Sequence, residues 1–332
     1  MMKAIVLTRY GSPDVLQIRE AAKPAPKDNE VLVRVRAVSV NYGDLLARNF
    51  GSVRPKDMHM PWLLWLIAKL SFGFRAPKVS ILGSEFAGDV EAVGQNVQAF
   101  RPGDAVFGYV GQRMGAYAEY VVTRETGELA KIPAGMTYEE AAAVPYGAIM
   151  AVNLMKKADL KPGQKVLING ASGAIGAAAL QIAKHLGAEV TAVCGGPRLE
   201  YVKALGADAA IDYAKEDFTQ SGQQYDLIFD VLGKSDFSRS QRALKPHGIH
   251  LYASFKSKQL LQMLATSRSG GKRVICALAP GSAEDLEEAR ALIEAGKIKA
   301  IIDRCYPMAQ AAEAHRYMEA GQRKGSVIIT MG

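Results

Sequence analysis

The sequence predicts an α/β fold in which a doubly wound parallel sheet is joined to a second, irregular and mostly β domain. Between residues 165 and 278, short runs rich in β-branched residues alternate with helical patterns, as in parallel βαβ units. Up to about residue 123, short β-like runs are instead broken by Gly and Pro. We therefore expect one domain over 1–124, completed by 281–332, and another over 125–280.

The elements of the first domain are predicted from alternating apolar residues and turn signals. Strands are expected over 31–40, 87–93 and 117–122, with turns over 24–26, 94–96 and 101–104. The pattern changes near Gly127, and an Ala-rich helical pattern then covers Tyr138–Val152.

The second domain and the C-terminal stretch continue the pattern. Strands are predicted over Lys165–Asn169, Glu189–Val193, Ala209–Asp212, Tyr225–Val231, Ile249–Ala253 and Arg273–Leu278, with helices over Gly173–Gly187 and Arg198–Leu205. Helices over Ser282–Ala295 and Ala309–Gly321 and a strand over Val327–Met331 follow, and we expect them to return to the first domain. Ser282 can cap its helix, since Asp285 stands three residues on.

Length and composition narrow the class of protein. A chain of 332 residues suits two domains, and 49% hydrophobic with 22% charged residues is ordinary for a globular protein. The start does not resemble a signal peptide, and the longest apolar run, Trp62–Ala68, is too short to span a membrane. We expect a cytoplasmic protein. Three scattered cysteines without a CxxC pair argue against disulfides and a structural zinc lobe.

The net charge of +8 is concentrated in one segment. Between Lys234 and Arg273 lie nine Lys or Arg residues and one acid, Asp236. A nucleic-acid groove would add stacking aromatic residues, which are few here, so we expect no nucleic-acid partner. A solvated face explains the segment, and attraction of an anionic cofactor or a membrane surface is the alternative.

The strongest local signal is the glycine-rich loop between a predicted strand and a predicted helix. Gly170 permits a tight turn, Gly173 lets the backbone approach a diphosphate, and Gly176 allows close packing of helix and strand. The helix N-terminus would present free N–H groups to the phosphates. The sequence thus predicts dinucleotide binding by Gly170, Ala171, Ser172, Gly173, Ala174, Ile175 and Gly176.

The end of the second strand of this domain indicates which nucleotide is bound. An NADH site usually has Asp or Glu there, whereas this chain has Val193-Cys194-Gly195-Gly196-Pro197-Arg198. Gly195 leaves room for a 2′-phosphate and Arg198 offers a cationic partner, with Tyr213 or Lys203 as assistants. We therefore predict NADPH, although Arg198 could also be a solvated residue of a helix.

Motifs along nearly the whole chain resemble the medium-chain dehydrogenase/reductase superfamily, in its zinc-free quinone oxidoreductase branch. They are Val40–Asp44, Leu82–Gly88, Val93-Gly94, Gly103–Gly108, Gly115–Tyr120, the loop at 170–176, Leu205–Asp208 and Ile211–Tyr213. The resemblance implies a GroES-like catalytic domain joined to a Rossmann domain, with the active site in the cleft and dimerisation through the edge of the Rossmann sheet.

Departures from the superfamily pattern bear on the chemistry. Zinc-containing members have a Cys near the position of Tyr42 and a His where Ser84 stands, and both are missing. A zinc site is therefore not expected, and polarisation of the substrate oxygen must come from hydrogen bonds or cofactor hydroxyls. Some zinc-free relatives place a Tyr a few residues after Asp44, where this chain has Leu46.

The resemblance also supplies candidate site residues. Asn41 is the first candidate for a group near the nicotinamide or the substrate, with Tyr42 and Asp44 as alternates; Asn41 could instead be a turn residue and Asp44 a helix cap. Loops after later strands would contact the cofactor through Leu232, Ser254 and Gly325, and Ser326 stands where the family often has Lys.

The segment 59–74 contains both tryptophans of the chain, Trp62 and Trp65. It is a candidate apolar lid over a lipophilic substrate, a surface helix touching lipid, or a helix packed against the core or a dimer partner.

The predicted function is therefore NADPH-dependent reduction of a small lipophilic quinone or α,β-unsaturated carbonyl by a zinc-free homodimer. The alternatives are a zinc-free alcohol or aldehyde reductase and a non-catalytic NADPH-binding sensor.

Overall fold

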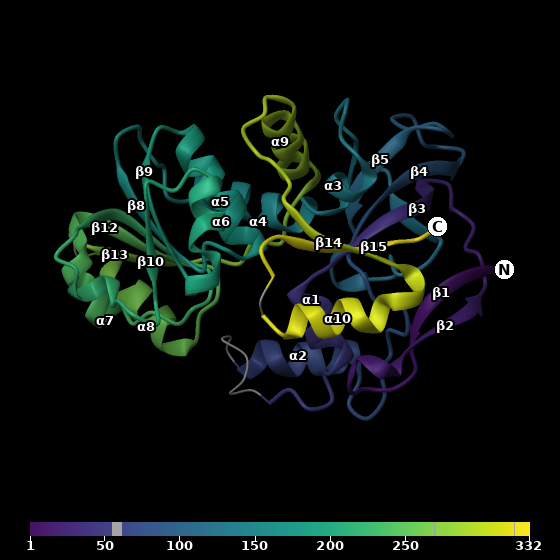
Figure 1. Cartoon of the computed structure of the whole chain (residues 1–332), viewed down its shortest axis with the longest axis horizontal. Coiled ribbons are helices and arrows are strands. Elements are labelled where there is room, and N and C mark those ends of the chain that lie inside the picture. Colours follow the sequence, from purple (N-terminus) through teal and green to yellow (C-terminus); the bar gives the residue numbers. More distant parts are fainter. Residues whose placement is uncertain (55–61, 269, 322) are drawn as a thin grey trace. The chain divides into compact units, whose positions relative to one another are not determined.

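The chain forms two compact units in the computed structural model, which describes residues 1–54, 62–268, 270–321 and 323–332. Unit 1 comprises Met1–Val53, Leu66–Tyr146 and Ser282–Gly332, and unit 2 comprises Gly147–Gly281 with the described part of Arg54–Trp65. Figure 1 shows their elements. The C-terminal stretch returns to the first unit, as the sequence predicts.

Unit 1 extends past the predicted boundary at 124/125, as far as Tyr146. Strand β7 (Glu128–Lys131) pairs with β5 (Ala105–Tyr109), and helix α3 (Tyr138–Ala142) contacts the same sheet. The single helix expected over 138–152 is two helices, because Pro145 lacks an N–H group and begins α4 (Pro145–Lys156) instead of continuing α3.

Unit 2 contains the predicted doubly wound parallel sheet. Its six strands are ordered β10-β9-β8-β11-β12-β13, and every neighbouring pair is parallel. Helices α5, α6 and α8 contact the strands that precede or follow them along the chain. The bounds are β8 (Lys165–Asn169), α5 (Ala174–His185), β9 (Glu189–Cys194), α6 (Leu199–Ala204), β10 (Ala209–Asp212), β11 (Tyr225–Asp230), α7 (Phe237–Ser240), β12 (Leu244–Tyr252), α8 (Ser257–Thr266) and β13 (Arg273–Cys276).

Strand β12 begins five residues before the predicted start at Ile249. The segment Lys245-Pro246-His247-Gly248 has the composition of a turn, but it forms an irregularity inside the strand. The pairing with β11 shifts register there, from Tyr225↔Leu244 to Leu227↔Ile249.

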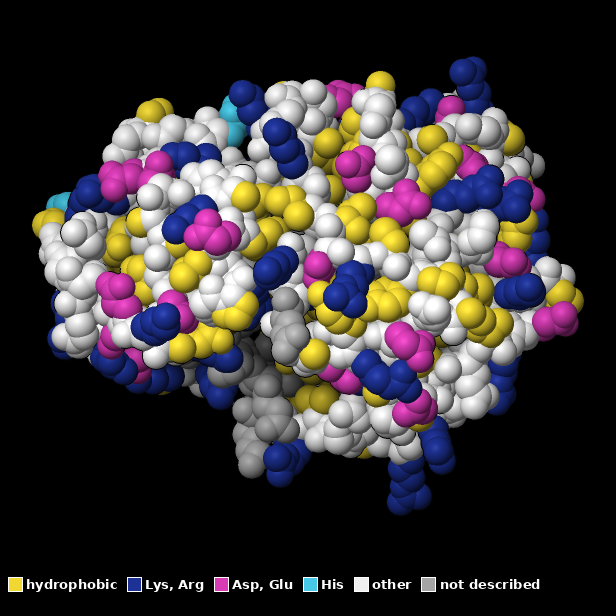
Figure 2. Space-filling view, in the orientation of Figure 1, with side chains coloured by type: hydrophobic (Ala, Val, Ile, Leu, Met, Phe, Trp, Pro, Cys, Tyr) yellow, Lys and Arg dark blue, Asp and Glu magenta, His cyan; other side chains and the backbone are white. Residues whose placement is uncertain are grey.

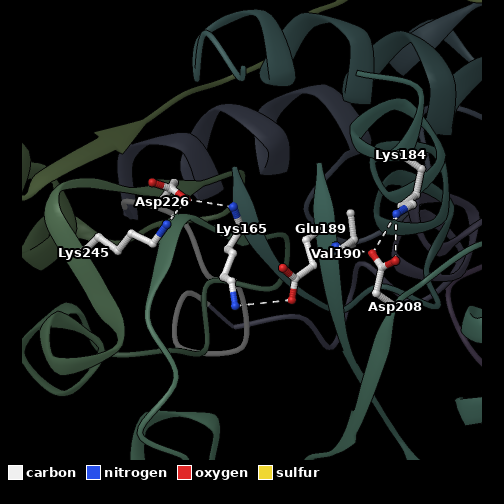
Figure 3. A network of polar contacts seen from close by, with 7 residues as sticks. All are labelled: Lys165, Lys184, Glu189, Val190, Asp208, Asp226 and Lys245. Atoms are coloured by element: carbon white, nitrogen blue, oxygen red, sulfur yellow. Dashed lines mark hydrogen bonds and ion pairs between the residues drawn. The ribbon is translucent and has the colours of Figure 1, made fainter. Parts of the chain in front are cut away.

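Ion pairs and backbone contacts join the strands of this sheet where they begin (Figure 3). Asp226 accepts a hydrogen bond from the Lys165 backbone N–H at 2.7 Å and pairs with the Lys245 ammonium at 2.7 Å. Asp208 accepts from the Val190 backbone N–H at 2.6 Å and pairs with Lys184 at 2.8 Å. Partly exposed pairs of this kind contribute about 0–1 kcal/mol each. They link the strands at the amino-terminal edge of the sheet. Open α/β sheets bind ligands at the opposite edge, where the strands end.

The basic segment Lys234–Arg273 is partly neutralised by acids of the same unit. Three ion pairs form: Arg239 with Asp217, Lys245 with Asp226, and Lys258 with Asp236. On the face shown in Figure 2, basic and acidic side chains are interspersed. These pairings favour a solvated surface over a continuous cationic groove for this segment.

Unit 1 is built around a seven-stranded sheet ordered β14-β15-β3-β4-β5-β7, with β6 paired to β3. A separate pair, β1 and β2, is antiparallel. Helix α9 begins at Ser282, whose hydroxyl accepts from the Asp285 N–H at 3.1 Å, as the sequence predicts. The bounds are β1 (Met2–Leu7), β2 (Leu16–Ala21), β3 (Glu30–Val40), α1 (Tyr42–Arg48), β4 (Glu85–Val93), β6 (Tyr120–Arg124), α9 (Ala283–Glu294), β14 (Ile302–Pro307), α10 (Ala311–Glu319) and β15 (Ser326–Thr330).

Replacement of Gly176 should destabilise the protein through a backbone clash. A Cβ at Gly176 would stand 2.2 Å from the Gly170 carbonyl oxygen and 2.8 Å from the Ala171 Cα, and neither atom can swing away. We expect Gly176→Ala to lower the free energy of unfolding by about 2 kcal/mol or more, measured by denaturant titration. Gly173→Ala is the matched control, since its nearest neighbour would be 3.5 Å away. Equal stabilities would contradict this account of the loop.

Candidate functional site

The carboxyl-terminal edge of the unit 2 sheet brings together most of the predicted cofactor residues. The loop after β8 turns at Gly170, whose φ of +90° lies in the region that favours glycine. The N–H groups of Gly170 and Ala171 donate to the Val193 carbonyl of β9 at 3.0 and 3.2 Å. Ala171 and Ser172 are buried, and Gly173 is the N-cap residue of α5. The loop thus forms a tight turn between the end of β8 and the start of α5.

The N-terminus of α5 offers backbone donors to an anion. The N–H groups of Ala174, Ile175 and Gly176 open a 12-residue helix, and such groups have no acceptor within their own helix. The helix dipole adds partial positive charge at this end. Gly173, the N-cap residue, has no side chain beside these groups. The geometry is suited to phosphate oxygens.

A buried carboxylate that the sequence analysis missed organises the neighbouring loop. Asp230, at the end of β11, accepts hydrogen bonds from the N–H groups of Leu232, Gly233 and Ser235 at 3.0, 3.0 and 2.7 Å. It also accepts from the Asn169 amide at 3.1 Å, which connects the loops after β8 and β11. Burial raises the pKa of Asp230, and hydrogen bonds from the Ser235 hydroxyl and from the three backbone N–H groups oppose that rise. An acid at the end of an apolar strand was the available sequence signal.

Leu232 and Ser254 lie at this same edge. A Cβ at Gly170 would stand 2.9 Å from the Leu232 side chain, and one at Gly233 would stand 2.3 Å from the Ser254 carbonyl oxygen. The loops after β8, β11 and β12 are therefore in contact. Gly325, by contrast, belongs to unit 1, where a Cβ would stand 2.5 Å from the Ile301 carbonyl oxygen of the segment before β14.

The predicted nucleotide-selecting residues converge after β9 and β10. The Arg198 guanidinium and the Tyr213 hydroxyl lie 3.1 and 3.4 Å from where a Gly195 Cβ would be. One feature differs from the sequence interpretation, in which no acid stands here. Strand β10 brings the Asp212 carboxylate to within 2.6 Å of a Cβ position on Gly196. The signal was missed because Asp212 ends the third strand of the domain, not the second.

The catalytic candidates of unit 1 lie at the start of α1. Asn41 caps this helix: its side chain accepts from the Asp44 N–H at 3.2 Å, and the Asp44 carboxyl accepts from the Asn41 N–H at 2.9 Å. The other Asp44 oxygen accepts from the Gly83 N–H at 3.0 Å. Asn41 and Asp44 are buried, whereas the Tyr42 side chain is 62% exposed. The structure thus brings Asn41 and Asp44 together and turns Tyr42 outward.

A second buried acid, Glu85, was not predicted as a site residue, although it lies in the motif Leu82–Gly88. The Asn41 amide donates to the Ser84 hydroxyl at 2.8 Å and to Glu85 at 3.2 Å. The other Glu85 oxygen accepts from the Tyr146 N–H at 2.8 Å. Burial raises the pKa of both Asp44 and Glu85 to about 7. Two carboxyls that can hold protons near neutral pH therefore flank Asn41.

The network continues from Asp44 to the C-terminal helix of unit 1. The Tyr117 hydroxyl interacts with Asp44 and lies 3.1 Å from His315 Nε2. Burial and the nearby Arg48 cation lower the pKa of His315 to about 3, so this imidazole is neutral. The fully buried Arg48 pairs with Glu319. These contacts join α1 to α10.

Helix α2 (Trp62–Phe72) covers most of the apolar segment, and residues 59–61 lie outside the described part of the chain. Within the described residues, no helix is both long and apolar enough to cross a bilayer. Among those residues there is also no group of three His, Cys, Asp or Glu side chains placed to hold a metal.

Comparison with known proteins assigns the chain to a family. Residues 27–134 match the alcohol dehydrogenase GroES-like domain, and residues 205–329 match a domain described as zinc-binding dehydrogenase. A mitochondrial NAD(P)H oxidoreductase of Mus musculus is 30% identical over all of this chain and 89% of its own length. The protein belongs to the medium-chain dehydrogenase/reductase superfamily.

Other members of the superfamily are similar over the same extent. A 2-methylene-furan-3-one reductase of Solanum lycopersicum is 28% identical over 99% of this chain and 79% of its own length. The solved quinone oxidoreductase from Coxiella burnetii has a TM-score of 0.84 at 26% identity, covering 100% of this chain and 99% of its own. This medium-chain dehydrogenase/reductase is thus an oxidoreductase with a nicotinamide cofactor, and its GroES-like and Rossmann units confirm the predicted fold.

The raised pKa of Glu85 has a consequence for stability. The folded protein keeps this proton up to about pH 7, while an unfolded chain loses it near 4.5. Between these values the folded state binds more protons, so the free energy of unfolding falls as pH rises. We expect Glu85→Gln to make this decline shallower by up to about 1.4 kcal/mol per pH unit.

The measurement is denaturant unfolding of both proteins from pH 4.5 to 7.5. His250 and His315, whose pKa values are lowered to about 3, act in the opposite direction in both proteins and cancel in the comparison. Glu91→Gln, at a more exposed position on the same strand, is the control. Parallel curves for wild type and Glu85→Gln would contradict the buried, protonated carboxyl.

Proposed function

We propose that this protein reduces small lipophilic quinones or α,β-unsaturated carbonyl compounds with NADPH and without zinc. The observation that carries the proposal is the carboxyl-terminal edge of the unit 2 sheet. There Tyr213, Arg198, the open N-terminus of α5 and the loop ordered by Asp230 follow the neighbouring strands β10, β9, β8 and β11.

The names of relatives support the substrate class. A 2-methylene-furan-3-one and a quinone both contain a carbonyl conjugated to a carbon–carbon double bond. Hydride addition to such a compound leaves negative charge on the oxygen, which hydrogen-bond donors must stabilise and a proton must neutralise. We extend this class to the present protein on the strength of the shared family.

The cofactor-holding residues follow from the geometry of unit 2. When bound, NADPH supplies the hydride. The N–H groups of Ala174, Ile175 and Gly176 would hold its diphosphate. Arg198 and Tyr213 would hold the 2′-phosphate above Gly195, which has no side chain to block it. Leu232 and Ser254 would contact the cofactor further along the same edge.

The unit 1 candidates have different roles in this proposal. Asn41 and Asp44 hydrogen-bond to each other. The Asn41 amide also donates to Ser84 and Glu85, and Asp44 accepts from the Gly83 N–H. We assign them to positioning. The Tyr42 side chain is exposed, and its hydroxyl forms no hydrogen bond within the described part of the chain. We assign this hydroxyl as the proton donor to the substrate oxygen.

Zinc independence is supported by the same cluster. Zinc-containing members of the superfamily place a His where Ser84 stands. Here the Ser84 hydroxyl accepts a hydrogen bond from the Asn41 amide, and amide N–H groups do not ligate zinc. The neighbouring Glu85 carboxyl is already bound by the Asn41 amide and the Tyr146 N–H.

The function is tested by NADPH oxidation with a panel of quinones, enones and simple aldehydes. We expect turnover of quinones or enones, unchanged after treatment with a strong chelator. Tyr42→Phe should slow turnover of the best substrate about 100-fold without changing NADPH affinity. Turnover of aldehydes alone, or NADPH binding without oxidation of any compound, would overturn the proposal.

The choice of NADPH is tested with a pair of variants. We expect Arg198→Ala to lower kcat/KM for NADPH about 10- to 100-fold and to leave NADH use nearly unchanged, because a charged hydrogen bond to phosphate contributes about 1.5–3 kcal/mol. Asp212→Asn keeps the acceptor for the Ala214 N–H and should not impair NADPH use. If Asp212→Asn instead abolished NADH turnover and the wild type preferred NADH, Asp212 would be binding a ribose hydroxyl.

A further inference from the structure

Helix α2 turns apolar side chains outward and a charged side chain inward. Trp62, Leu63, Ile67 and Leu70 are between 51% and 64% exposed, whereas Lys69 is only 6% exposed. A helix on the surface of a soluble domain ordinarily has the reverse arrangement. These apolar side chains are therefore open to a partner within the part of the chain that the structure describes.

The inward lysine fixes the rotation of the helix about its axis. The Lys69 ammonium donates to the Phe50 carbonyl at 3.0 Å and lies 5.3 Å from the centre of the Phe50 ring. The Phe72 ring packs against the same ring, with centroids 5.2 Å apart. Turning the apolar face inward would break the hydrogen bond to the Phe50 carbonyl and the packing of the two Phe rings.

Three of the exposed apolar residues share one side of the helix. Leu63, Ile67 and Leu70 follow an i, i+4, i+7 spacing, which places them on one side of the helix. Trp62 stands at the start of the helix, and Phe74, 53% exposed, follows its end. The five side chains together expose roughly 500 Å², within the range of patches that are often functional.

The charges carried by the helix and the segment that follows it have a single sign. Residues 62–84 contain Lys69, Arg75 and Lys78 and no Asp or Glu. Arg75 and Lys78 are exposed, and the Lys78 ammonium donates to the Leu70 carbonyl at 2.9 Å, so it lies at the end of the helix. Cations at the border of an apolar helix face complement anionic headgroups.

We infer that α2 docks the protein on an anionic lipid surface. The helix lies in the plane of the interface, with Leu63, Ile67 and Leu70 among the acyl chains and Arg75 and Lys78 at the headgroups. A second copy of the chain is less well matched, because this face falls short of the about 800 Å² per partner of a standard interface and its own cations would repel their counterparts. The inference does not depend on the proposed function.

The test is flotation of the full chain with vesicles of phosphatidylcholine, with and without phosphatidylglycerol. We expect binding to the anionic vesicles, with a blue shift in fluorescence from Trp62 and Trp65, the two tryptophans of the chain. Ile67→Glu with Leu70→Glu should abolish binding. Arg75→Gln should weaken it about fivefold.

The matched control is Leu261→Glu with Leu264→Glu on α8, two leucines that are 67% and 66% exposed. This variant should bind vesicles as the wild type does. Circular dichroism and thermal melting establish that each variant is folded. Because flotation needs no turnover, its result is separate from that of the substrate panel.

Four outcomes would overturn the inference. The wild type could fail to bind anionic vesicles, or the α2 variant could bind as well as the wild type. Alternatively, the α2 variant could change the oligomeric state in the absence of lipid, measured by light scattering, which would identify a second copy as the partner of this face. Loss of binding only in the α8 variant would assign the lipid contact to the basic segment of unit 2.

Discussion

The close approach of α5 to the end of β8 is the constraint on which the cofactor edge depends. With hydrogen alone on Gly176, the helix can begin against the Gly170 carbonyl oxygen. Gly170 in turn adopts its positive φ and donates to the Val193 carbonyl of the neighbouring strand. The direction of the first N–H groups of α5 follows from these contacts. A bulkier residue would push the helix outward and move the donors away from the strand ends.

Much of the fold could be predicted from the sequence where local pattern and tertiary environment agree. Strands β8 and β10 have the predicted bounds, because their apolar runs are flanked by turn residues on both sides. The prediction of a single helix over 138–152 was wrong. The helical spacing of apolar residues continues through Pro145, but the helical hydrogen bonding is interrupted there. The short α1 was missed, since its seven residues are held by the Asn41–Asp44 capping box and not by periodicity.

The candidate site was less predictable, because its buried acids act on residues distant in sequence. Asp212 approaches Gly196 only because β10 and β9 are neighbours in register. Glu85 contacts Asn41 and the Tyr146 backbone, which are 44 and 61 positions away. A sequence pattern within one segment carries no information about contacts between segments that are distant in sequence. The glycine-rich loop was predictable because its parts are consecutive, whereas the environment of Asn41 comes from several segments of unit 1.

Asp230 holds together the loops after β8 and β11, which has a practical consequence for protein engineering. One carboxylate accepts hydrogen bonds from the side chain that ends β8 and from three backbone groups of the loop after β11. The two loops are therefore not independent modules. A loop transplanted from a homologue after either strand would keep its shape only if the graft preserved both the acid and the amide at position 169, so redesign of cofactor preference is better confined to the ends of β9 and β10.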